Sequence, residues 1–128
     1  MAVEYKMSDL IETAHRQAII SPVSEIATEM QNLLSRSMTA YMVNVKEGRT
    51  ISRWANKETT DIRHDSEQRL RAAYEIAQLI GTYYSPEVAR AWFIGCNPRL
   101  DDATPADALH EGKLREVLSA AQAFIVSE

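Results

Sequence analysis

The sequence predicts an all-α protein, and three observations support this fold class. Apolar residues recur every three or four positions, and no stretch alternates between apolar and polar residues as a half-buried strand does. A hydroxyl residue is followed by proline three times, at Ser21-Pro22, Ser85-Pro86 and Thr104-Pro105. Each pair predicts a helix start, because the hydroxyl accepts from a free backbone N–H and proline suits the first helical position. Only 4 glycines and 4 prolines interrupt the 128 residues, so long helices are expected.

Four long helices are expected, over about residues 7–20, 22–35 and 65–83 and from residue 114 onward. Asp65 or Ser66 is expected to cap the third of them. The apolar face of the first 20 residues is a candidate for self-association. The residues at helical spacing that should face the core are Leu10, Ile11, Ala14, Ala18, Ile26, Met30, Leu33, Leu34, Leu70, Ala73, Tyr74, Ala77, Ile80, Leu114, Val117, Leu118, Ala121 and Ile125.

Two short helices are predicted between residues 38 and 57, joined by a turn at Lys46-Glu47-Gly48. In the second, Ile51, Trp54 and Ala55 share one face and should be buried. The opposite face carries side chains that suit phosphates and base edges. These candidate DNA-binding residues are Arg49, Thr50, Ser52, Arg53, Asn56 and Lys57. A helix pair with the second helix displayed has the parts of a helix-turn-helix.

The charge distribution also indicates that this segment binds DNA. Between Arg36 and Arg71 there are eight basic and five acidic residues, whereas the rest of the chain has six basic and thirteen acidic ones. A basic middle in a chain of net charge −4 indicates a local footprint for a polyanion. The alternative is a solvated helix face of mixed charge.

Residues 90–112 contain the most distinctive series of signals. A helix that carries Trp92 should stop at Gly95, an Asn97-Pro98 turn should follow, and a short helix should run from Thr104-Pro105 to about Gly112. Cys96 is expected to be a small, partly buried residue. Beyond this stretch, Phe124 and Ile125 either close the core or offer an apolar end to a partner.

Both segments resemble the Xre/MbcA/ParS-type antitoxins. The order Trp92, Asn97-Pro98, Leu100, Thr104-Pro105-Ala106-Asp107, Leu109 and Gly112 is similar to the toxin-binding domain of that family, and Ile51-x-x-Trp54 is similar to the recognition helix of Xre-type repressors. The likeness spans about residues 30–126. One departure concerns the turn, since the family's small residue and turn glycine fall on Tyr41 and Val45 here.

The resemblance implies an N-terminal helical arm (1–22), a helix-turn-helix-like segment (23–63) and a toxin-binding domain (64–128). It implies an antitoxin that binds and inhibits a RES-domain toxin, an enzyme that consumes NAD, and that represses its own operon as a homo-oligomer or as a complex with the toxin. Residues expected to contact the toxin are Trp92, Asn97, Pro98, Arg99, Asp101, Phe124 and Ile125. The alternatives are a stand-alone DNA-binding transcriptional regulator and, less favoured, a structural homo-oligomer.

The sequence argues against an enzyme. His15, His64 and His110 do not share the spacing of metal ligands, and there is neither a glycine-rich phosphate loop nor a nucleophile elbow, so no catalytic residue, metal or cofactor is expected. No apolar run approaches the roughly 18 residues of a membrane span, no secretory leader is evident, and Cys96 has no partner cysteine. These features predict a cytoplasmic protein.

Overall fold

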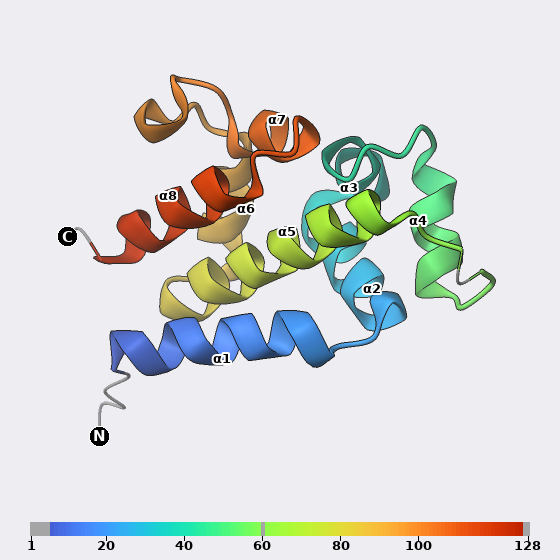
Figure 1. Ribbon diagram of the computed structural model, residues 1–128, viewed down its shortest axis with the longest axis horizontal. Helices are drawn as coiled ribbons and strands as arrows, with labels where there is room; N and C mark the ends of the chain where they lie inside the picture. Colours follow the sequence, from blue (N-terminus) through green and yellow to red (C-terminus); the bar gives the residue numbers. More distant parts are fainter. Residues whose placement is uncertain (1–5, 60, 127–128) are drawn as a thin grey trace.

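A computed structural model describes residues 6–59 and 61–126, and every regular element in those ranges is a helix (Figure 1). The all-α prediction is therefore confirmed. The elements are α1 (Met7–Ile20), α2 (Val23–Leu34), α3 (Arg36–Met42), α4 (Gly48–Ala55), α5 (His64–Tyr83), α6 (Pro86–Ile94), the 3-10 helix η1 (Pro98–Leu100), α7 (Pro105–His110) and α8 (Leu114–Val126). None of these helices is long and apolar enough to cross a membrane.

Helix α5 is the longest element and organises the others around it (Figure 1). Helix α1 lies along one side of it, α6 and α8 along another, and α2 and α3 near its beginning, while α4 packs on α2 and α3 at one edge of the molecule. Residues from all three expected segments belong to one continuous hydrophobic core, in which Leu70, Ile76 and Ile80 of α5 are fully buried. The described helices thus share a single core.

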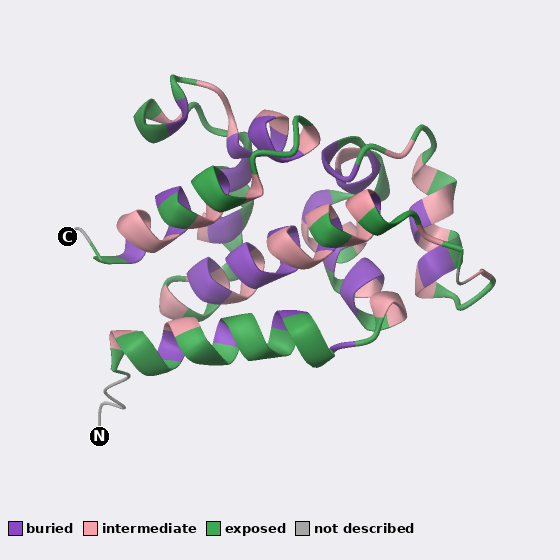
Figure 2. Cartoon of the chain, viewed as in Figure 1, coloured by how far each residue is buried: buried purple, intermediate pink, exposed green. Residues whose placement is uncertain are grey.

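Helix α1 is docked on α5 and does not project as a free arm. Its apolar residues Leu10, Ala14 and Ala18 are buried between the two helices, and the opposite side of α1 is exposed (Figure 2). The face predicted for self-association is therefore occupied within the chain.

Polar contacts hold α1 at both its middle and its end. The buried carboxylate of Glu75 lies 3.1 Å from His15 Nδ1. At the end of α1, the Arg71 guanidinium donates to the carbonyl oxygens of Ala18, Ile19 and Ser21 at 2.9, 3.3 and 2.8 Å. Because the last carbonyls of a helix lack partners inside it, Arg71 satisfies groups that would otherwise be unpaired.

Two of the three predicted hydroxyl-proline helix starts are confirmed. The Ser85 hydroxyl accepts from the backbone N–H of Val88 at 3.1 Å, and the Thr104 hydroxyl accepts from that of Asp107 at 3.0 Å. Each cap satisfies one of the donors left free in the first turn.

The third hydroxyl-proline start and the expected cap of α5 are wrong. Helix α2 begins at Val23 with Pro22 at the N-cap, and Ser21 is buried, with its carbonyl bound by Arg71. Helix α5 begins at His64, ahead of Asp65 and Ser66. Asp65 therefore lies in the first turn, and its carboxylate pairs instead with Arg69 at 3.4 Å.

Candidate functional site

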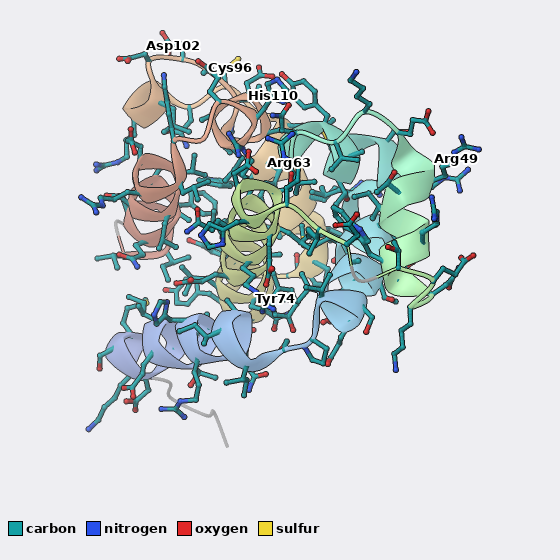
Figure 3. The ribbon with its side chains drawn as sticks, turned by 45° about the vertical axis from the view of Figure 1, so that its right-hand side comes forward. Arg49, Arg63, Tyr74, Cys96, Asp102 and His110 are labelled. Atoms are coloured by element: carbon teal, nitrogen blue, oxygen red, sulfur yellow. The ribbon has the colours of Figure 1, made fainter. Side chains whose placement is uncertain are left out.

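The predicted inner face of α4 is buried as expected. Ile51 and Trp54 pack against α2 and α3, and Ala55 is partly buried. The indole Nε1 of Trp54 is buried without a hydrogen-bond acceptor among the described residues. This packing leaves the opposite side of α4 facing outward at the edge of the molecule (Figures 1 and 3).

Four of the six candidate DNA-binding residues are exposed on that outer side, namely Arg49, Arg53, Asn56 and Lys57. Arg49 points away from the molecule in Figure 3 and pairs with Glu47 at 2.7 Å. Within the described residues, Arg53 and Lys57 make no ion pair. Their charges are therefore available to a polyanion.

The expectation that Ser52 presents its hydroxyl outward is wrong. Ser52 is partly buried, and its Oγ donates to Gln31 Oε1 of α2 at 3.1 Å and accepts from the Arg36 guanidinium at 3.4 Å. Thr50 is also only partly exposed. Ser52 therefore joins α4 to its neighbours.

The turn between α3 and α4 accommodates its unusual residues. Asn44 has a left-handed backbone (φ 63°), which asparagine tolerates better than most residues, so the turn forms without a glycine at Val45. Tyr41 is 41% exposed, and its ring stacks on that of His110 of α7 with 4.3 Å between centroids. A large residue fits at position 41 because it packs between the two halves of the chain.

Residues 97–103 form a closed elbow in which Asn97 makes four hydrogen bonds. Its backbone N–H donates to the carbonyl of Ala103, and its carbonyl accepts from the N–H groups of Leu100 and Asp102, all at 2.9–3.0 Å. Its side-chain Oδ1 accepts from the N–H of Arg99 at 2.9 Å. Asn97 therefore determines the shape of the elbow. From the sequence alone, this structural role could not be distinguished from direct contact with a partner.

The elbow presents charged residues at its tip. Asp101 and Asp102 are consecutive left-handed residues (φ 56° and 65°) and both are exposed, with Asp102 at the outer end of the loop in Figure 3. Such backbone conformations cost energy and often occur at functional loops. Pro98 and Arg99 are also exposed, and so is Cys96, which corrects the prediction that its side chain is partly buried.

The expected apolar contact residues divide into buried and exposed groups. Ile125 is fully buried and Trp92 is buried, so both belong to the core and have little surface to offer a partner. Phe124 is partly buried and lies 6.2 Å from Trp92 and 5.1 Å from Tyr84 between ring centroids. The exposed part of this apolar end comes from residues that sequence reasoning missed, Tyr84 (39% exposed) and Val126 (59% exposed).

Contacts between α3 and α7 join the α3–α4 pair to the C-terminal half of the chain. The Tyr41 hydroxyl donates to Asp107 at 2.6 Å, and His110 Nδ1 lies 2.7 Å from the Tyr41 carbonyl oxygen. Because a carbonyl oxygen only accepts, Nδ1 carries the proton. The hydrogen bond to Asp107 is the main cause that raises the pKa of Tyr41 above 10.0, followed by burial and the negative charge of Asp107. The Arg69 guanidinium adds a bond to the carbonyl of Leu109 at 3.0 Å.

No known family model, curated protein or solved structure matches this chain. Within the described ranges, no group of three His, Cys, Asp or Glu residues could hold a metal ion. The candidate surfaces are therefore the outer side of α4 and the C-terminal end, which comprises the elbow together with Tyr84, Phe124 and Val126.

Proposed function

We propose that this protein is an antitoxin that binds and inhibits a RES-domain toxin, an enzyme that consumes NAD. The observation that carries the proposal is the partly exposed apolar end of the chain, where the Tyr84 ring (39% exposed) lies 5.1 Å from that of Phe124. Val126, two residues further along α8, is 59% exposed. Aromatic residues are enriched at protein interfaces, and Tyr84 and Phe124 form an aromatic pair at this end. The resemblance of residues 90–112 to a toxin-binding domain supports the same role.

The elbow supports binding by a preformed surface. Its hydrogen bonds to Asn97 hold the loop that carries Arg99, Asp101 and Asp102, so these charges lose little conformational freedom when a partner docks. The charges would contribute specificity at the edge of the interface, and the apolar end of α8 would contribute most of the affinity.

We infer a second function, repression of the protein's own operon through the outer side of α4. The unpaired cations Arg53 and Lys57 support it, together with Arg49 and Asn56 on the same side. Helix α4 and the end of α8 lie at opposite edges of the molecule, so DNA and toxin would not compete for one surface (Figure 1). A chain that binds DNA and has no toxin encoded in the neighbouring reading frame would instead be a stand-alone regulator.

The test is co-expression with the RES-domain toxin of the neighbouring reading frame, with cellular NAD and co-purification as readouts. The wild-type chain should preserve NAD and co-purify with the toxin. Val126→Asp should weaken the complex at least about tenfold, as expected for an apolar contact residue near the centre of an interface. Ile19→Asp is the matched control, because Ile19 is equally exposed (60%) but lies on α1.

Substitution is a sharper test than truncation, because removal of the last residues would also remove the buried Ile125 and disturb the core. Failure of the wild-type chain to bind or inhibit the toxin would refute the antitoxin proposal. Equal loss of binding in Val126→Asp and Ile19→Asp would show that the end of α8 is not the specific toxin interface.

A further inference from the structure

A cavity outside both candidate surfaces lies between α3, the α3–α4 connection and α7. Its volume is about 360 Å³, at the lower end of the range of small-molecule sites. Its polar lining residues come from three places in the chain: Ser37 from α3, Asn44 and Lys46 from the connection, and His110 from α7. Residues more than sixty positions apart therefore meet in one hollow.

The charge of this lining is unusual for an acidic protein. No aspartate or glutamate lines the cavity, although the chain has a net charge of −4. Lys46 is exposed and makes no ion pair among the described residues. Carboxylates lie close to the lining, since Asp107 accepts from the Tyr41 hydroxyl and the negative charges of Asp107 and Glu111 both act on Tyr41, whereas Glu47 pairs with Arg49. Among the side chains that line the cavity, Lys46 is therefore the one with a permanent charge.

His110 is held in place for a ligand on its second ring nitrogen. Its Nδ1–H is committed to the carbonyl of Tyr41, and its ring is stacked on the Tyr41 ring at an interplanar angle of 6°. Within the described residues, its Nε2 has no hydrogen-bond partner. Because Nδ1–H is committed to Tyr41, the ring can donate to an anion from Nε2 when both nitrogens carry a proton.

We propose that this cavity binds a phosphate group, and that the phosphate belongs to a nucleic-acid backbone. A lysine, a histidine, a hydroxyl and a side-chain amide are the donors that proteins use to contact phosphate oxygens. The cavity adjoins the first residue of α4, Gly48, so a backbone that crosses the outer side of α4 can place a phosphate there. The choice of nucleic acid as the source rests on the DNA binding proposed above. The proposal that the cavity binds a phosphate group does not depend on that DNA binding.

The structural consequence is that α7 contributes to nucleic-acid binding. Helix α7 directly follows the elbow, and His110 lies at its end. A partner that shifts α7 would move His110 away from the phosphate and weaken the complex with DNA. The contact between Tyr41 and His110 would then couple the C-terminal half of the chain to the α3–α4 pair.

The first experiment titrates the full-length chain with inorganic phosphate and follows its amide resonances by NMR. Saturable shifts are expected at Ser37, Asn44, Lys46 and His110. Lys46→Gln and His110→Gln should each weaken this binding at least about fivefold. Arg115→Gln is the control, because Arg115 is an exposed cation on α8 that does not line the cavity. Circular dichroism checks that each variant is folded, and Lys46→Gln is the decisive variant because Lys46 is exposed.

The second experiment measures the affinity for a random-sequence duplex at several salt concentrations. Lys46→Gln should reduce the slope of log affinity against log salt by about one, the value expected for loss of one phosphate contact, and Arg115→Gln should leave the slope unchanged. Phosphate shifts at the cavity without any DNA binding by the wild-type chain would refute the nucleic-acid source and retain a site for a free phosphate compound. The absence of phosphate shifts at the cavity would overturn the proposal, whether or not DNA binds.

Discussion

The rings of Tyr41 and His110, sixty-nine positions apart in the chain, stack in parallel with 4.3 Å between their centroids. The same two residues share a hydrogen bond, and the Tyr41 hydroxyl reaches Asp107 one turn earlier in α7. This contact joins the helix pair α3–α4 to the helices that follow the elbow. The contact therefore helps to hold the two candidate surfaces at a defined position relative to each other.

The Tyr41–Asp107 hydrogen bond predicts a loss of stability in alkaline solution. Because the pKa of Tyr41 is raised on folding, the folded chain holds this proton more tightly than the unfolded chain. The stabilisation is therefore complete below pH 10 and is lost as the pH rises through the higher pKa of the folded state. Urea unfolding between pH 8 and pH 11 should show the decline, and Tyr41→Phe should reduce it.

Tyr41→Phe should have a small effect on stability at neutral pH and should remove only part of the loss of stability in alkaline solution. Tyr41→Phe should cost no more than about 1 kcal/mol at neutral pH, because the hydroxyl is near the surface. Some alkaline loss should persist, since the pKa of Tyr74 is also raised, chiefly by burial. Identical pH profiles for the wild type and Tyr41→Phe would contradict the role given to the hydrogen bond.

Asn97 should prove to be a structural residue of the elbow. Asn97→Ala removes the Oδ1 that accepts from Arg99, and the expected cost is about 1 kcal/mol, as for loss of a side-chain cap. Hydrogen exchange should accelerate at the N–H of Leu100 and Asp102, whose acceptor is the Asn97 carbonyl. Asn97→Asp keeps the acceptor and should preserve slow exchange. If Asn97→Ala leaves exchange unchanged but weakens partner binding, Asn97 acts by direct contact instead.

Two glycines should respond in opposite ways to alanine. Gly112 has φ +85°, and a Cβ there would lie 2.9 Å from Arg69 Nη2, so Gly112→Ala should destabilise the fold by about 1–2 kcal/mol. Gly81 lies inside α5, where a Cβ would meet nothing within 4 Å. Gly81→Ala should therefore stabilise the fold by about 0.5–1 kcal/mol. Midpoints of thermal and urea unfolding measure both changes, and a shift of the same sign in both variants would refute the argument.

The pair of His15 and Glu75 should contribute to the docking of α1. His15→Ala leaves the buried carboxylate of Glu75 without its partner, and the expected cost is about 1–2 kcal/mol, given that the histidine is largely exposed. Glu75→Gln removes the charge, so His15→Ala should cost less in that background. A double-mutant cycle by urea unfolding measures the coupling, and a coupling energy of zero would show that this pair does not contribute to the docking of α1.

The sequence by itself determined the helices and much of their burial. Local signals suffice for both, because apolar spacing defines the inner face of a helix, as it did for Ile51 and Trp54. The caps at Ser85 and Thr104 are equally local, since each hydroxyl bonds a backbone group three residues away. The predicted cap at Ser21 was wrong, because the position of Ser21 depends on a distant contact, the bond between its carbonyl and Arg71, fifty residues further on.

Only the tertiary structure decided which residues of the candidate surfaces are accessible and which groups meet. Ser52 and Ile125 were predicted to contact a partner. The hydroxyl of Ser52 instead bonds Gln31 of α2, and Ile125 is buried in the core. The ring contact between Tyr84 and Phe124, and the cavity beside His110, depend on contacts between distant helices. Helical periodicity shows which face of each helix is apolar, whereas long-range packing decides what that face covers and what it leaves exposed.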